Sequence, residues 1–226
     1  MTPKYARCVD PIISYVLELL DRIERGTEPD PARENSEIKK LFNKAEAEFG
    51  STDEWVLARY ALAAWVDEVL IIAPWKGAVW WVNNTLEWHF FNTALRGVLF
   101  FNNASRATQL ATRNAIEIYY ICVVLGFRGI YRERTASLDS QPFSPDLEPQ
   151  RIAALAESEG LPSSLRAWFE QAAASIRGGG LPQPEPHGVP PSQAYPLEAQ
   201  SLLIGSLLVF AVLGAITLIT AMLTLT

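Results

Sequence analysis

Residues 57–70 read LARYALAAWVDEVL, an apolar run that two adjacent carboxylates, Asp67 and Glu68, interrupt. At steps of about 100° around an ideal helix, one set of side chains gathers on a single face that we expect to be buried: Trp55, Ala58, Leu62, Trp65, Val66 and Val69. The opposite face is also apolar, is rich in small residues and carries both carboxylates near its C-terminal end. A helix that is apolar almost all round is central to its domain, so this stretch predicts the centre of the fold.

Three roles are open for Asp67 and Glu68. A catalytic or metal-binding pair is disfavoured, because adjacent side chains on one helix diverge by about 100° and His89 has no companion at ligand spacing. A structural ion pair is available if the GFRGIYRER stretch folds back, since it contains Arg128, Arg132 and Arg134. Docking of a protein partner is the third role, and it is compatible with the second if each carboxylate serves one of them.

Helical spacing continues along most of the chain. Asp10-Pro11 and Asp30-Pro31 each predict an N-cap followed by a first helical residue, in helices that Gly26 and Gly50 end. The central helix should begin at a capping box of Ser51 and Glu54 and end near Ile72, because Pro74 blocks its continuation. Further helices are expected at about 78–95, 104–126 (with a break near Thr112), 149–158 and 163–176. The sequence therefore predicts an all-α domain of about seven helices.

Composition narrows the function classes. The net charge is −6, and no basic stripe indicates a nucleic-acid partner. Cys8 and Cys122 are far apart and form no metal-ligand pattern, so we expect two reduced thiols. The chain contains no phosphate-binding loop, nucleophile elbow, zinc-protease or dinucleotide-binding motif. We therefore expect no cofactor, no metal and no enzymatic activity.

The chain divides into three segments by composition. Residues 1–177 form the helical domain, residues 178–201 are a Pro/Gly-rich linker, and residues 202–225 are 24 residues without a charge. As a helix this last segment would span about 36 Å, more than the hydrocarbon core of about 30 Å, so it predicts a transmembrane tail anchor. The N-terminus lacks the continuous apolar segment of a signal peptide. We therefore expect a single-pass protein with a cytoplasmic N-terminal domain.

Three stretches together resemble one protein family. They are ARYALAAWVDEVLIIAPW at 58–75, LEWHFFN at 86–92 and YYICVVLGFRGIYR at 119–132, and they are similar to the DotU/IcmH/TssL family. Members of this family are accessory components of bacterial type VI and type IVB secretion systems in the inner membrane. The resemblance implies a hook-shaped cytoplasmic domain of two small helical bundles on one C-terminal span, with the C-terminus in the periplasm.

The resemblance also implies a scaffold role and its partners. These are a large IcmF/TssM-like inner-membrane subunit, baseplate components in the cytoplasm and, indirectly, an outer-membrane lipoprotein. Independently of the resemblance, the predicted span implies contact with the lipid bilayer, and its small-residue pairs Ala211-xxx-Ala215 and Thr217-xxx-Ala221 are compatible with a homodimer. The resemblance suggests that Asp67 and Glu68 belong to the cytoplasmic docking surface, whereas the other motif residues are structural: Tyr60, Pro74, Trp75, Gly126, Phe127, Gly129, Tyr131 and Arg132. The alternatives are a type IVB counterpart with other partners, or a tail-anchored enzyme or adaptor with an unrecognised site.

Overall fold

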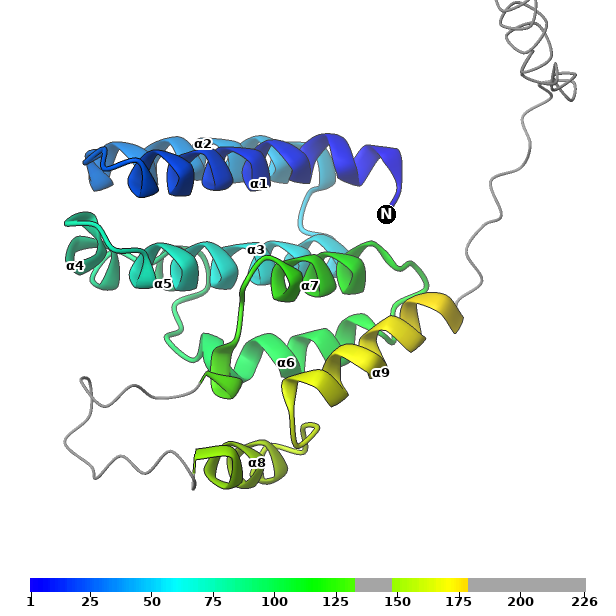
Figure 1. Ribbon diagram of the computed structural model, residues 1–226. Helices are drawn as coiled ribbons and strands as arrows, with labels where there is room; N and C mark the ends of the chain where they lie inside the picture. Colours follow the sequence, from blue (N-terminus) through cyan, green and yellow to red (C-terminus); the bar gives the residue numbers. More distant parts are fainter. Residues whose placement is uncertain (133–147, 179–226) are drawn as a thin grey trace, which may run out of the picture. The chain divides into compact units, whose positions relative to one another are not determined.

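Helices make up all the regular secondary structure in the described part of the chain. The computed structural model describes residues 1–132 and 148–178, which confirms the all-α prediction (Figure 1). These residues form nine α-helices and one 3₁₀-helix: α1 (Pro3–Glu24), α2 (Pro31–Phe49), α3 (Asp53–Ile72), α4 (Gly77–Val82), α5 (Leu86–Phe91), α6 (Arg96–Ala107), α7 (Asn114–Val124), η1 (Gly129–Tyr131), α8 (Glu148–Ser158) and α9 (Leu165–Gly178). The number exceeds the expected seven, chiefly because residues 78–95 contain two short helices.

Helix α3 is the centre of the fold, as its sequence predicted. It packs against α2, α4, α5, α6 and α7, and Figure 1 shows it running alongside α7. Its predicted core face is buried, with Trp55, Leu62 and Trp65 fully inaccessible, and so is the small-residue face around Ala61 and Ala64. Because neighbours cover α3 along most of its length, the buried polar groups on this helix must find their partners inside the protein.

Local capping signals place the start of α2 correctly and the start of α3 one residue too early. The Asp30 side chain accepts a hydrogen bond from the backbone N–H of Ala32, and Gly50 ends α2 with a φ of +62°. The N-cap of α3 is Thr52, whose hydroxyl oxygen accepts from the N–H of Trp55, and not Ser51 as the sequence suggested. Glu54 consequently does not close a capping box, and it instead bonds the side chains of Thr112 and Asn114.

The predicted start of the first helix at Asp10-Pro11 is wrong. Helix α1 begins at Pro3, and Pro11 lies inside it. An internal proline costs a helix about 3 kcal/mol, since it lacks an N–H and its ring crowds the preceding turn. The helix continues through Pro11 because its inner face buries a full row of side chains: Tyr5, Val9, Ile12, Val16, Leu19 and Ile23. Tertiary packing thus overrides a strong local stop signal.

The middle of the chain is more broken than the sequence predicted. Thr85 caps α5 by accepting from the N–H of Trp88, and Asn92 ends it in a left-handed conformation. The break expected near Thr112 is confirmed, because it falls between α6 and α7. Short helices connected by tight turns bring α5, α6 and η1 to the C-terminal half of α3, which is where the two carboxylates lie.

The described helices cluster into one compact unit that spans Met1–Leu181. The two small bundles implied by the resemblance are therefore not separate compact units here. The predicted linker at 178–201, apart from Gly178 at the end of α9, and the predicted span at 202–225 lie outside the described residues, as does most of the loop expected between α7 and α8. Within residues 1–132 and 148–178, no helix has the length and apolar character needed to cross a membrane.

Candidate functional site

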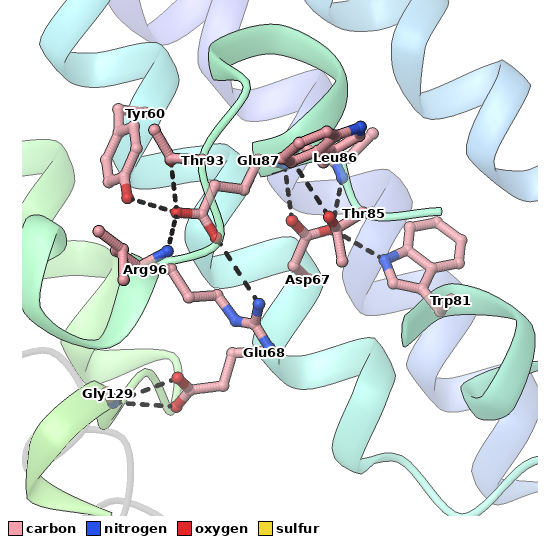
Figure 2. Close-up of polar contacts among 12 residues, drawn as sticks. Tyr60, Asp67, Glu68, Trp81, Thr85, Leu86, Glu87, Thr93, Arg96 and Gly129 are labelled. Atoms are coloured by element: carbon pink, nitrogen blue, oxygen red, sulfur yellow. Dashed lines mark hydrogen bonds and ion pairs between the residues drawn. The ribbon is translucent and has the colours of Figure 1, made fainter. Parts of the chain in front are cut away.

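Asp67 is fully buried and binds the beginning of α5. Its carboxylate accepts hydrogen bonds from the backbone N–H groups of Leu86 (2.8 Å) and Glu87 (2.8 Å) and from the indole N–H of Trp81 (2.9 Å) (Figure 2). The N–H groups of a first helical turn have no partner within the helix and favour a negative charge. A negative charge is unfavourable near the C-terminal end of its own helix, where Asp67 lies. The side chain reaches the N-terminus of α5, however, and the N–H groups there stabilise its charge.

Burial nevertheless shifts the pKa of the Asp67 carboxyl group. Desolvation raises the pKa of Asp67 from 3.8 to about 6, although the three N–H donors act in the opposite direction. The donors stabilise the ionised form, whereas removal from water destabilises it, and the second effect is the larger. Asp67 is therefore an internal structural group whose ionisation near neutral pH weakens the fold.

Glu68 turns in another direction and binds the segment between α7 and η1. Its carboxylate accepts from the backbone N–H groups of Arg128 (2.6 Å) and Gly129 (3.2 Å), and it forms an ion pair with the Arg132 guanidinium (2.5 Å). Arg132 is thus the arginine that folds back to the acidic pair. The Arg128 guanidinium instead donates to the carbonyl oxygens of Val123 and Phe127, and Arg134 lies outside the described residues.

A third buried carboxylate, Glu87, was missed by the sequence analysis. Its Oε1 accepts from the Tyr60 hydroxyl (2.8 Å), the Thr93 hydroxyl (2.8 Å) and the Leu95 N–H (2.9 Å), as Figure 2 shows. Its Oε2 makes no hydrogen bond but faces the Arg96 guanidinium at 3.6 Å. Since the Glu87 N–H also donates to Asp67, the two carboxylates belong to one polar network. The signal in the sequence was a lone acidic residue within the apolar stretch LEWHFF.

Tyr60 and Trp75, both expected to be structural, make internal hydrogen bonds. Tyr60 is buried with its hydroxyl on Glu87, and burial together with this carboxylate raises its pKa. Trp75 lies just beyond the end of α3, where Pro74 prevents another helical turn, and its buried indole donates to the Leu70 carbonyl oxygen within the last turn of α3 (2.8 Å). The Trp75 contact thus satisfies a carbonyl group at the C-terminal end of the central helix.

The glycine and aromatic residues of the second motif shape the backbone that Glu68 binds. Gly129 has a φ of +52°, and a Cβ atom there would lie 2.7 Å from the carbonyl oxygen of Gly97. Phe127 is buried and stacks on Phe100 with ring centroids 3.9 Å apart. The Tyr131 hydroxyl donates to the Pro162 carbonyl oxygen at 2.6 Å, and Gly126 also has a positive φ (+108°). The motif therefore builds a tight turn with its N–H groups aimed at Glu68.

The arrangement of the acidic pair matches that of structural groups. Asp67 and Glu68 point to different partners and do not converge on one position. Among the described residues, no group of three His, Cys, Asp or Glu side chains is placed to hold a metal ion. The structure also places Asp67 wholly inside the protein, so in this conformation it offers a partner no accessible atom. That is a correction to the expectation that both carboxylates face a docking surface.

Glu68, by contrast, lies at the edge of a surface cavity together with its ion-pair partner Arg132. One cavity of about 350 Å³ is lined by Glu68, Ile71, Ile72, Ala94, Arg96, Gly97, Gly129 and Arg132. A neighbouring cavity of about 720 Å³ is lined by Leu20, Ile23, Glu24, Gly26, Val69, Ile72, Ala73, Pro74, Gly126 and Arg132. Ile72 and Arg132 line both cavities, and Ile72 is 49% exposed. The described surface beside Glu68 is therefore a hollow that is apolar around Ile72 on the side of the larger cavity and charged around Glu68, Arg96 and Arg132.

Comparison with known proteins identifies the family of this chain. A solved structure, the cytoplasmic domain of TssL from Acinetobacter baumannii, is similar at 22% identity with a TM-score of 0.47, and the match covers 71% of this chain and 96% of that one. No curated protein sequence matches the chain significantly. The model of one family, described as type VI secretion system protein DotU, matches residues 4–226. This chain therefore belongs to the DotU family of type VI secretion system proteins.

Proposed function

We propose that this chain is a non-enzymatic scaffold that links an IcmF/TssM-like inner-membrane subunit to the cytoplasmic baseplate of a type VI secretion system. The observation that carries the proposal is the family match, which extends over residues 4–226 and so includes both the helical domain and the apolar C-terminal segment. The three carboxylates of the site, Asp67 and Glu68 on α3 and Glu87 on α5, support a scaffold role. Each of them binds N–H, O–H or guanidinium groups of the protein itself.

Residues 202–225 would anchor the scaffold in the inner membrane. A stretch of 24 residues without a charge is long enough to cross a bilayer as one helix. In the proposed topology the helical domain faces the cytoplasm and the C-terminus lies in the periplasm. This orientation puts the hollow beside Glu68 on the same side as the baseplate.

The docking surface that we propose is this hollow, and not the carboxylates themselves. Its exposed wall is apolar around Ile72 and also contains the charged residues Glu24, Glu68, Arg96 and Arg132, and apolar surface beside charges of both signs suits an amphipathic segment of a baseplate component. Glu68 would act by holding Arg132 and the Gly129 backbone in the wall. Asp67 would act one step further away, by fixing α5 against α3.

Affinity capture from detergent-solubilised membranes, with partners identified by mass, tests both parts of the proposal. Wild-type chain should recover an IcmF-like subunit and baseplate components. Ile72→Glu should lose the baseplate components alone, because a charge in the hollow opposes apolar burial. Val79→Glu is the matched control, since Val79 is 76% exposed and lines neither cavity.

The outcomes separate the scaffold role from the docking surface. Capture of baseplate components by Ile72→Glu at the wild-type level would exclude the hollow while leaving the scaffold role in place. Recovery of the wild-type chain without any IcmF-like subunit would refute the scaffold itself.

A further inference from the structure

A separate cavity lies between α1 and α2, away from the carboxylate network. Its volume is about 350 Å³, within the range of about 300–1,000 Å³ that small-molecule sites occupy. One face of each helix lines it at i, i+3, i+4 and i+7: Lys4, Arg7, Cys8 and Pro11 from α1, and Leu41, Lys44, Ala45 and Glu48 from α2. The cavity exists because Cys8, Pro11 and Ala45 are short side chains where the two helices face each other.

The charges around this cavity differ from those of the whole chain. Three cationic residues and one carboxylate line it, whereas the chain carries a net charge of −6. The Lys4 ammonium donates to the Glu48 carbonyl oxygen at 3.0 Å and lies over the Phe49 ring. In the described part of the chain, Arg7 and Lys44 form no ion pair or hydrogen bond through their side chains. Two cations at one cavity are thus left for an external anion.

The shape and chemistry of the lining indicate which anion. A guanidinium binds phosphate through two parallel N–H bonds, and a nearby ammonium adds a point charge. The apolar side chains of Pro11, Leu41 and Ala45 offer a surface for an attached organic group. Pro11 also has no N–H to bond the Arg7 carbonyl oxygen within the helix, which leaves an acceptor for a ligand hydroxyl.

We propose that the α1–α2 cavity binds a small phosphate ester, with Arg7 and Lys44 on the phosphate and Leu41 and Ala45 against the organic part. The ester has two sources, a soluble phosphate ester or the headgroup of an anionic phospholipid. The proposal is independent of the docking surface beside Glu68, because the two cavities share no lining residue.

Cys8 provides a direct readout of occupancy. It is half-buried and lines the cavity, whereas Cys122 is fully buried. In the folded full chain, N-ethylmaleimide should therefore modify Cys8 alone, and a bound ester should shield it. At a ligand concentration of about ten times Kd, the alkylation rate should fall by about tenfold, since the fraction of free cavity falls by that factor.

The experiment uses the full chain in two settings. In non-ionic detergent, glycerol phosphate is compared with potassium chloride at the same ionic strength. In vesicles, phosphatidylglycerol is compared with phosphatidylcholine. Shielding by glycerol phosphate identifies a soluble ester as a sufficient ligand, and shielding by phosphatidylglycerol alone identifies a headgroup. Either result supports the proposal.

Variants test the assigned residues. Arg7→Gln combined with Lys44→Gln should raise the Kd for the ester by about a hundredfold, because each charge-assisted hydrogen bond contributes about tenfold, so shielding at the same ligand concentration should almost disappear. Lys40→Gln is the matched control on α2, since Lys40 is exposed, pairs with Glu37 and lies outside the cavity. No shielding in any setting, equal shielding by potassium chloride, or full shielding of the double variant would overturn the proposal. Far-ultraviolet circular dichroism confirms that each variant is folded.

Discussion

Replacing Asp67 with Asn keeps the size of the side chain but removes one acceptor. In the wild-type chain Oδ1 accepts from the Trp81 indole N–H and the Leu86 N–H, while Oδ2 accepts from the Glu87 N–H. An asparagine amide has a single acceptor oxygen, and its NH₂ group only donates. Whichever way the amide is oriented, its NH₂ group therefore faces at least one N–H donor in a site that water cannot reach.

The expected change in stability follows from the orientation of the introduced amide that keeps more hydrogen bonds. With the amide oxygen in the Oδ1 position, two hydrogen bonds survive and the Glu87 N–H loses its acceptor. A hydrogen bond to a charged acceptor contributes about 1.5–3 kcal/mol, but Asp67→Asn also removes the buried charge whose desolvation raises the pKa of Asp67 to about 6, a gain of up to about 3 kcal/mol. Because the two effects oppose each other, we expect the free energy of unfolding at neutral pH to change by less than about 2 kcal/mol. The opposite orientation loses two bonds and costs more. Because domains are typically stable by about 5–15 kcal/mol, the variant should remain folded.

Urea unfolding of the full chain in mild detergent, followed by far-ultraviolet circular dichroism at neutral pH, measures this net change. Asp21→Asn is the matched control on α1, where Asp21 is exposed and pairs with Arg25. Surface ion pairs contribute at most about 1 kcal/mol, so the control should change stability little. If Asp67→Asn instead raised the free energy of unfolding at neutral pH by about 3 kcal/mol or more, the lost hydrogen bond would contribute nothing, and the assignment of Asp67 as a three-donor acceptor would be wrong.

Three further predictions follow from single residues. Because burial raises the pKa of Asp67 to about 6, the folded state binds more protons than the unfolded state above pH 3.8, so wild-type stability should fall by up to about 3 kcal/mol as the pH rises through about 6. Urea titrations at several pH values check this, and Asp67→Asn should lack that component of the decline. Gly129→Ala should destabilise the fold by about 1–3 kcal/mol in the same assay, since its φ is +52° and a Cβ atom would meet the Gly97 carbonyl; an unchanged urea midpoint would contradict this. Pro11→Ala should raise thermal stability by about 1–3 kcal/mol, because it restores an N–H for the Arg7 carbonyl, and a lower melting temperature would contradict it.

Local patterns were sufficient where neighbours along the chain decide the structure. Asp30-Pro31 and Gly50 mark the two ends of α2 correctly, because a cap acts on the N–H and C=O groups of its own helix. The same reasoning misplaced the start of α1 at Asp10-Pro11. There the burial of one face of α1 against the rest of the domain outweighs the local cost of Pro11.

The candidate site shows a similar division. The sequence identified Asp67 and Glu68 as charges in an apolar helix and Arg132 as an available partner, since charged side chains are visible as letters. It did not identify the backbone N–H groups of Leu86, Glu87, Arg128 and Gly129, which supply most of the hydrogen bonds to the pair. Every residue except proline has such a group, so composition and spacing say nothing about which ones are free and aimed at a carboxylate.

The sequence by itself thus determined that this protein is all-helical, that α3 is its central helix, and that the acidic pair of α3 needs internal or external partners. Helical periodicity and the cost of burying charge are properties of a short stretch of chain, and they can be read there. Only the tertiary structure decided that α5 and the turn before η1 supply those partners, that Glu87 completes the network, and that Asp67 is closed to the outside while Glu68 borders a hollow. These features depend on which helix ends meet across the core, and that is settled by the packing of the whole domain.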